Sequence, residues 1–246
     1  MKAALLGGTK GIGRALARLL AEKGHEVCLL GRDLEDLKRS AQDIQIRGAV
    51  GKTVPVAECD LSRPETFGPA LERAAAELQG LDWVIVTAAA FATQEKLESD
   101  RALTRDLLTT NFANTILFCE EARERLLARG GGTLCVLSSV SGDRARKPVI
   151  LYGASKAGLS AYLEGLDHKF RSQGLKTITV KPGFVKTGMT SGLTPPPFAG
   201  EPEGVAKDIL GAIEQGRPLV YTPKMWRLVM LVIRNLPRFV MRRIEF

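Results

Sequence analysis

The chain has 246 residues, of which 45% are hydrophobic and 25% charged, a composition typical of a soluble globular protein with a sizeable core. Its 35 lysines and arginines exceed its 27 acidic residues, and this net charge of +8 predicts an anionic partner: nucleic acid, a phosphorylated small molecule or an anionic membrane surface. Four scattered cysteines and two histidines predict buried thiols in a reducing compartment and no metal site. An immediate first strand leaves no room for a signal peptide and predicts a cytoplasmic protein.

Short apolar runs alternate with longer amphipathic segments along the chain, so the hydrophobic period switches between that of a strand and that of a helix. This alternation predicts an α/β fold, a single-domain Rossmann-type doubly wound parallel sheet flanked by helices. We expect this domain to occupy residues 1–222 and a basic amphipathic segment to occupy residues 223–246. The predicted strands are Ala3–Leu6, Val27–Leu30, Thr53–Ala57, Trp83–Thr87, Thr133–Ser138, Thr177–Lys181 and Leu219–Tyr221, and the predicted helices are Gly11–Glu22, Leu34–Arg47, Pro64–Leu78, Arg105–Ala128, Tyr152–Ser172 and Glu203–Gln215.

The first predicted strand leads directly into a glycine-rich turn, Gly7 to Gly13, and a helix follows. Such a turn lets the backbone approach a pyrophosphate and directs the helix N-terminus at it, so we expect a dinucleotide site. After the second strand, Arg32 occupies the place where an NAD-selective site usually has an acid, and with Lys10 it favours the 2′-phosphate of NADP(H). Asp33 leaves an alternative open, in which it caps the next helix and Arg32 is merely solvated.

A second group of polar residues follows the fifth predicted strand. Ser139 stands at the end of that strand, and Tyr152 and Lys156 lie four residues apart in a predicted helix. This spacing puts the phenol and the ammonium on one helix face, where the cation is expected to lower the phenol pKa from about 10. We expect Tyr152 to give a proton to a carbonyl oxygen and Ser139 to donate a second hydrogen bond to the developing oxyanion.

These motifs, in this order, resemble those of the short-chain dehydrogenase/reductase family over nearly the whole chain. The resemblance implies a catalytic set of Asn111, Ser139, Tyr152 and Lys156, in which the asparagine holds a proton-relay water near the lysine. In two departures from the family pattern, Leu6 replaces a threonine before the first glycine, and Val86-Thr87-Ala88-Ala89 replaces Asn-Asn-Ala-Gly. The implied cofactor-binding residues are Gly7, Thr9, Lys10, Gly11, Ile12, Gly13, Arg32, Asp60, Leu61, Ala88, Tyr152, Lys156, Pro182, Gly183, Val185 and Thr187.

The positive charge is concentrated near the end of the chain. Residues 221–246 hold six cations and one acid, a net of +5, which leaves only +3 for residues 1–220. We therefore expect the anion to be a cofactor or a lipid, and we expect no nucleic-acid partner. The apolar, arginine-rich sequence from Lys224 predicts either an interfacial helix on the inner membrane face, interrupted at Pro237, or a helix that packs on the domain or on a second subunit.

The segment from Ser138 to Tyr152 and the chain end also resemble one branch of the family, which reduces a keto-pentose carried on decaprenyl phosphate. We expect an NADPH-dependent reductase that converts a ketone, small or lipid-linked, to a secondary alcohol. Two alternatives stay open: a reductase of 3-oxoacyl chains or other hydrophobic carbonyls, and a non-catalytic NADP(H)-sensing binding protein. The family resemblance also implies a homodimer or homotetramer.

Overall fold

The computed structural model describes residues 1–47 and 53–244, and in this part of the chain seven strands form one sheet whose neighbouring strands are all parallel. The strands are β1 (Lys2–Leu6), β2 (Glu26–Gly31), β3 (Val56–Glu58), β4 (Trp83–Val86), β5 (Gly132–Leu137), β6 (Leu175–Pro182) and β7 (Leu219–Thr222). Their spatial order is β3-β2-β1-β4-β5-β6-β7. The chain therefore winds outward from β1 and then resumes beside it at β4, which confirms the predicted doubly wound sheet.

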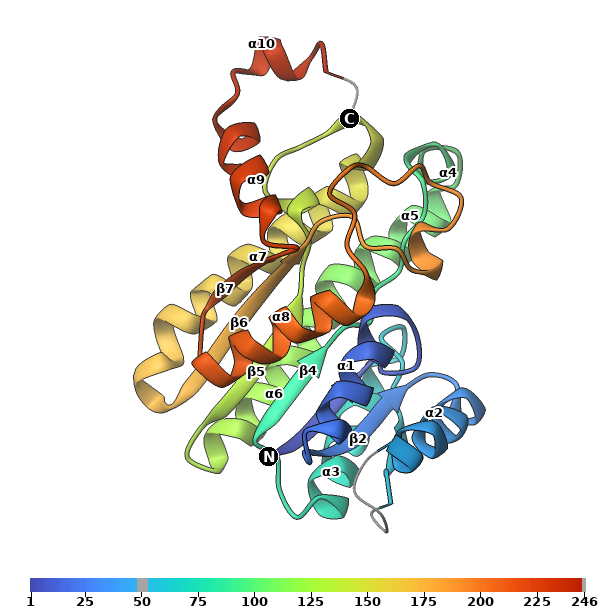
Figure 1. The fold of residues 1–246 in the computed structure, drawn as a ribbon, viewed down its shortest axis with the longest axis vertical. Helices are drawn as coiled ribbons and strands as arrows, with labels where there is room; N and C mark the ends of the chain where they lie inside the picture. The colour runs from blue at the N-terminus through green and yellow to red at the C-terminus, as the bar shows by residue number, and fades with distance from the viewer. Residues whose placement is uncertain (48–52, 245–246) are drawn as a thin grey trace.

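Helices cover both faces of this sheet (Figure 1). Buried side chains of the first, second and eighth helices pack on one face, and those of the third, sixth and seventh pack on the other. The helices are α1 (Gly11–Glu22), α2 (Leu34–Arg47), α3 (Phe67–Glu77), α4 (Gln94–Ser99), α5 (Arg101–Leu108), α6 (Thr115–Ala128), α7 (Ile150–Phe170), α8 (Pro202–Gln215), α9 (Met225–Asn235) and α10 (Arg238–Met241).

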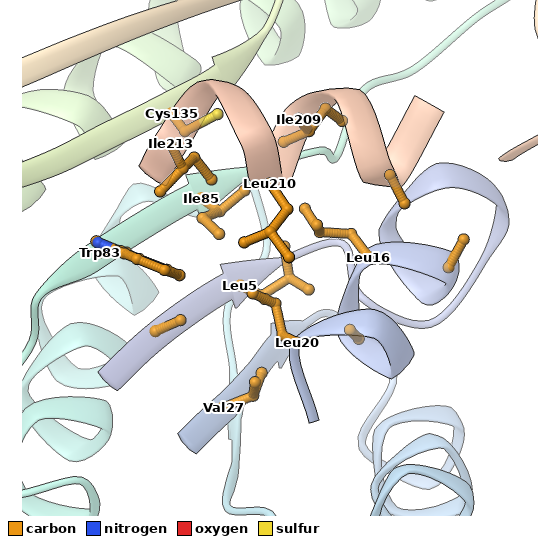
Figure 2. Packing of buried hydrophobic residues seen from close by; sticks show 14 of the residues in the cluster. Leu5, Leu16, Leu20, Val27, Trp83, Ile85, Cys135, Ile209, Leu210 and Ile213 are labelled. Carbon is orange, nitrogen blue, oxygen red and sulfur yellow. The ribbon is translucent and has the colours of Figure 1, made fainter. Parts of the chain in front are cut away.

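The core beneath α1 and α8 fixes the glycine turn in place. Leu16 and Leu20 of α1 and Ile209 of α8 are fully buried over the inner strands, as Figure 2 shows. Residues Ala3–Leu6 of β1 are also buried, because a parallel strand covered on both faces reads as a continuous apolar run. The turn that follows β1 therefore emerges from a rigid support at the carboxyl edge of the sheet.

One predicted helix, Arg105–Ala128, is wrong as a single element. The structure divides this region into α5, a π-helical turn over Thr109–Asn114 and α6. Such turns are often found at functional sites, and this one carries the buried Asn111, whose side chain bonds to the backbone after β4. The structure also adds α4, which periodicity did not reveal because the helix has six residues.

The chain end forms a separate pair of helices, α9 and α10, which are interrupted at Leu236–Pro237 as predicted. One face of α9 packs on the body of the protein through Trp226, Met230 and Ile233, which cluster with Val140. The opposite face is apolar yet exposed, with Leu228, Leu231 and Val232 each about 60% accessible. The packed face shows that this helix packs on the domain, which was one of the two expectations, whereas the membrane contact stays a prediction.

None of the helices in the described part of the chain combines the length and the hydropathy that a membrane span requires. Cys28, Cys59, Cys119 and Cys135 are buried free thiols, as predicted. Burial raises the pKa of all four, to about 12 for Cys28 and Cys59, which leaves them protonated and inert at neutral pH. Within residues 1–47 and 53–244, no group of three or more His, Cys, Asp and Glu side chains is placed to hold a metal ion.

Candidate active site

The predicted catalytic residues meet at the carboxyl edge of the sheet. Ser139 follows β5, and Tyr152 and Lys156 lie in the first two turns of α7. The Lys156 ammonium nitrogen is 5.9 Å from the centre of the Tyr152 ring, and Ser139 forms a hydrogen bond with the phenol. Gly142 permits this arrangement, because a Cβ there would lie 2.7 Å from the backbone of Lys156, so the serine segment lies directly against α7.

The protonation states of these groups follow from their burial. Burial raises the pKa of the Tyr152 phenol to about 12, and the hydrogen bond from Ser139 offsets part of that rise. Burial also lowers the pKa of the Lys156 ammonium to about 8, although its Nζ donates to the Leu137 carbonyl at 3.0 Å. The expectation that the lysine lowers the phenol pKa is thus wrong in this structure, since removal from water dominates at both groups. At neutral pH the phenol holds its proton and is able to give it.

Asn111 connects the catalytic helix region to the loop after β4. Its side chain is fully buried, accepts a hydrogen bond from the Ala90 N–H at 2.7 Å and donates to the Ala90 carbonyl at 2.8 Å. Both ends of the amide are therefore engaged in holding residues 88–91 in place. Phe91, at the end of this loop, lies edge-on to Tyr152 with ring centres 5.3 Å apart. Asn111 thus positions a loop that contacts the phenol.

The glycine turn between β1 and α1 forms a cradle for a dinucleotide. A Cβ at Gly13 would lie 2.1 Å from the Gly7 carbonyl oxygen, and one at Gly7 would lie 2.7 Å from the Ala88 nitrogen. Side chains at either position would collide with the protein's own backbone, so glycine is required for the tight turn that brings the backbone and the start of α1 together for a pyrophosphate. In the segment Val86-Thr87-Ala88-Ala89, which replaces Asn-Asn-Ala-Gly, the Thr87 hydroxyl donates a hydrogen bond to the Leu6 carbonyl at 3.1 Å. This bond holds the start of the glycine turn against β4. The residues present fit the cofactor.

Two cations lie near this cradle, Lys10 in the glycine turn and Arg32 after β2. Arg32 is exposed, and the Lys10 side chain is 80% exposed, with its ammonium nitrogen 3.4 Å from the Asp36 carboxylate. Asp33 caps α2, because its Oδ1 accepts from the N–H groups of Glu35 and Asp36 at 3.0 Å each. These hydrogen bonds, the one from Asp36 foremost, hold the pKa of Asp33 below its usual value. The capping role left open for Asp33 is therefore present, while Arg32 and Lys10 remain accessible.

The remaining predicted cofactor residues divide into three groups. Thr187 lies against the glycine turn, since a Cβ at Gly11 would be 3.2 Å from its methyl group. Pro182, Val185 and Leu61 have buried side chains, so their backbones alone are available to a ligand. The other members lie along the same edge: Thr9 and Ile12 in the turn, Asp60 after β3, Ala88 after β4 and Gly183 after β6.

Asp60 closes the cradle beyond β3. Burial pushes its pKa upward, but hydrogen bonds from the Ser62 N–H and hydroxyl and the nearby charges of Arg63 and Arg32 outweigh burial and lower the pKa overall. The carboxylate is thus ionised and held in a fixed turn. Such a group can accept a hydrogen bond from a ligand amine without itself moving.

Motif reading missed a second polar group beside the catalytic one. The buried Asp143 carboxylate pairs with Lys181 of β6 and accepts a hydrogen bond from the Tyr221 hydroxyl of β7 at 2.6 Å. Trp226 of α9 lies over Gly183, where a Cβ would be 2.1 Å from the indole, and donates to the Phe198 carbonyl at 3.2 Å. These contacts join the chain end to the active-site edge. The run of charges after Ser141 was the one sequence signal for them.

Comparisons with known proteins identify the family to which the chain belongs. A model of the short chain dehydrogenase family matches residues 2–197. An uncharacterized oxidoreductase of Mycobacterium tuberculosis is 31% identical, over 97% of this chain and 95% of its own length. Carbonyl reductase family member 4 of Xenopus tropicalis is 28% identical over 86% of this chain and 90% of its own. A short-chain type dehydrogenase/reductase from Mycobacterium ulcerans has the same fold, with a TM-score of 0.81, 19% identity and coverage of 98% and 97% of the two chains. The chain therefore belongs to the short-chain dehydrogenase/reductase family and is an oxidoreductase that acts with NAD(P)(H).

Proposed function

We propose that this protein uses NADPH to reduce a ketone to a secondary alcohol, with Tyr152 as the proton donor, and that the ketone is a keto-sugar carried on a polyprenyl phosphate. The observation that carries the first part is the contact of Ser139 and Tyr152 beside the buried Lys156. The name of the Xenopus relative, carbonyl reductase, supports the same class of reaction. The second part depends on the chain end.

The proton transfer follows from the protonation states. Tyr152, with a pKa of about 12, is a neutral phenol at pH 7 and gives its proton to the carbonyl oxygen as negative charge develops there. The Ser139 hydroxyl donates a second hydrogen bond to the same oxygen. The Lys156 cation stabilises the phenolate that remains. NADPH, when bound, supplies the hydride that reaches the carbonyl carbon.

Two accessible cations, one in the glycine turn and one after β2, support NADPH as the cofactor. Lys10 and Arg32 are both exposed, and an ammonium and a guanidinium suit a 2′-phosphate better than a ribose hydroxyl. Asp33 already accepts two backbone hydrogen bonds as a helix cap, which leaves it less suited to bind a 2′-hydroxyl. A kcat/KM for NADH that equals the value for NADPH would contradict this choice of cofactor.

The chain end supports a lipid-linked substrate. The exposed face of α9, with Leu228, Leu231 and Val232, continues to Phe239 of α10, which is 62% accessible. Exposed arginines flank these apolar side chains. Apolar residues ringed by cations suit an anionic membrane surface, where a polyprenyl phosphate resides.

The proton donor is tested by Tyr152→Phe, with Tyr221→Phe as a matched control that removes the second phenol of this edge. With a ketone that the wild type reduces, kcat/KM of Tyr152→Phe should fall by about 10²- to 10⁴-fold while NADPH affinity is retained. Tyr221→Phe should keep wild-type turnover. NADPH oxidation is measured against keto-sugars on short polyprenyl phosphates, 3-oxoacyl thioesters and simple hydrophobic ketones. Retained turnover in Tyr152→Phe would contradict the proton donor.

The membrane contact is tested by Leu228→Gln/Leu231→Gln, since both side chains are exposed and their replacement spares the packed face of α9. Sedimentation with phosphatidylglycerol liposomes at low salt should weaken by at least about tenfold, because two leucines lose their apolar burial. The control is Leu103→Gln/Leu117→Gln, which alters exposed leucines of α5 and α6. Wild-type protein that stays in the supernatant would contradict a membrane contact.

A further inference from the structure

The segment between β6 and α8 forms a closed loop at the carboxyl edge of the sheet. At its base the Gly200 N–H donates to the Phe184 carbonyl at 2.8 Å, and the Lys186 N–H donates to the Gly200 carbonyl at 2.9 Å. Residues 186–199 lie between these bonds, and we call them the edge loop. In Figure 1 the orange segment between β6 and α8 loops out beyond the end of the sheet. The bonds at the base do not determine where the rest of the loop lies, so its position depends on contacts further along.

The first part of the edge loop contacts the glycine turn. A Cβ at Gly11 would lie 3.2 Å from the methyl group of Thr187. Thr190 holds Thr187 in place, because its hydroxyl oxygen accepts from the Thr187 N–H at 3.1 Å and its hydroxyl donates to the Val185 carbonyl at 2.7 Å. This end of the edge loop therefore lies beside the turn at which we expect the dinucleotide to bind.

The last part of the edge loop contacts the chain end. The Nε1–H of Trp226, in α9, donates to the Phe198 carbonyl at 3.2 Å. A Cβ at Gly200 would lie 2.6 Å from the ring of Pro223, so the residue directly after the loop also lies against the segment that precedes α9. Trp226 is buried, and packing fixes its ring before any ligand arrives. Its N–H is thus a preorganised donor for the end of the loop.

The same indole lies against the segments that follow β5 and β6. A Cβ at Gly183 would be 2.1 Å from the indole, so the absence of a side chain there provides the room in which the ring lies. Trp226 also belongs to the apolar cluster of Val140, the residue after Ser139. One side chain therefore joins three parts of the active-site edge: the segment that carries Ser139, the segment after β6 and the edge loop.

We propose that Trp226 is a positioning residue for the reduction, because it holds the edge loop where a bound cofactor and ketone meet it. This inference rests on the proposed binding of NADPH and applies to any ketone. A loop that is held less often in the competent position raises the apparent dissociation constant of a ligand without changing the chemical step. The exposed apolar side chains that the loop would present to a ligand are Met189, Leu193 and Phe198.

The test is Trp226→Phe, which keeps an aromatic ring over Gly183 and removes the donor to Phe198. Chymotrypsin cleavage within residues 186–199, where Leu193 and Phe198 are exposed, should become about two- to tenfold faster, the range expected from one lost hydrogen bond. In calorimetric titration of the full chain, the affinity for NADPH should fall by a similar factor. With a ketone that the wild type reduces, KM should rise likewise while kcat stays within about twofold, because the groups that transfer the proton are unchanged.

The matched control is Trp83→Phe, the same substitution at the other of the two tryptophans. Trp83 is 6% exposed against 8% for Trp226, and it stands at the start of β4, at the opposite edge of the sheet. This control should melt at a lower temperature than the wild type but keep its cleavage rate, NADPH affinity and KM. Circular dichroism gives the melting midpoint of each variant. Equal changes of cleavage and affinity in the two variants would overturn the role of Trp226 in favour of general destabilisation.

A second variant, Gly200→Ala, disturbs the end of the loop and leaves Trp226 in place, because its Cβ would press on Pro223. It should also speed cleavage and raise KM. Wild-type cleavage and NADPH affinity in Trp226→Phe would overturn the positioning role, and so would a kcat that falls while KM is unchanged. A wild type that reduces no ketone would contradict the proposed function, whereas faster cleavage of Trp226→Phe would still support the role of Trp226, since cleavage is read without turnover.

Discussion

Two tyrosine–lysine pairs lie on either side of the segment 139–143, and they have nearly the same geometry. The Lys156 nitrogen is 5.9 Å from the centre of the Tyr152 ring, and the Lys181 nitrogen is 5.8 Å from that of Tyr221. Both phenols have a pKa raised to about 12, with burial as the leading cause. Residue types and the distance from the nitrogen to the ring therefore do not separate the proposed catalytic pair from a structural one in this molecule.

The two tyrosine–lysine pairs differ in the polar side chain that contacts the phenol, which is Asp143 for Tyr221 and Ser139 for Tyr152. Asp143 pairs with Lys181 and accepts the hydrogen bond of the Tyr221 hydroxyl, so that the cation is neutralised and the phenol proton is held. Ser139 instead gives Tyr152 a neutral hydroxyl, which leaves the phenol proton free to move to a substrate. A carboxylate thus turns the pair into a clamp for β6 and β7, whereas a hydroxyl leaves it able to act as an acid.

Replacing Ser139 should mainly reduce turnover, whereas replacing Asp143 should mainly reduce stability, and these are the largest effects we expect. Ser139→Ala should lower kcat by about 10²- to 10³-fold, because a donor to the developing oxyanion is lost, while the midpoint of thermal unfolding stays close to that of the wild type. Asp143→Ala should lower the unfolding free energy by about 3 kcal/mol, because Lys181 loses its partner in a largely buried position. Steady-state turnover and calorimetric melting measure the two quantities on each variant.

The control for this comparison is the turnover of Asp143→Ala, measured well below its melting midpoint. It should remain within about fivefold of the wild type, because Asp143 contacts neither Tyr152 nor the carbonyl oxygen in the proposed reaction. A loss as large as that of Ser139→Ala would show that the two sets act as one unit and that the distinction between clamp and acid is wrong.

The same comparison explains how far the sequence predicts this molecule. Helices α1 and α2 begin and end where the apolar period places them, because each spans more than two turns and buries one continuous face. The sequence also predicts the pair of Tyr152 and Lys156, since they are four residues apart in one helix. It does not predict the contacts among Asp143, Lys181 and Tyr221, because these residues come from three parts of the chain that meet only in the folded sheet.

The same reason accounts for the other differences. The π-helical turn at Thr109–Asn114 interrupts a region of helical period because Asn111 bonds to Ala90, a contact between residues 21 apart. The position of Trp226 over Gly183 depends on where α9 folds back. Lys156 was expected to lower the phenol pKa, yet burial governs both groups, and burial is a property of the whole fold. Local spacing thus predicts which groups can meet, whereas tertiary packing decides their protonation.

A smaller effect concerns the two lysines themselves. Lys156 is 2% exposed and forms no ion pair with a carboxylate within residues 1–47 and 53–244, and burial lowers its pKa to about 8. In the unfolded chain the pKa is about 10.4, so the unfolded state binds more protons between pH 8 and pH 10.4. The destabilisation from this group is therefore complete below pH 8 and disappears as the pH rises through 10.4. At pH 7 it amounts to about 3 kcal/mol.

Lys156→Met should consequently melt a few degrees higher than the wild type at pH 7 although it loses turnover, and this advantage should vanish near pH 10.5. Lys181→Met should melt lower than the wild type at pH 7, because it strands the buried carboxylate of Asp143 instead of relieving a buried cation. Denaturant unfolding at several pH values gives both differences. A wild type more stable than Lys156→Met at pH 7 would contradict this prediction. It would mean that the hydrogen bond from Lys156 to the Leu137 carbonyl outweighs the cost of burying the ammonium, so that both lysines stabilise the fold.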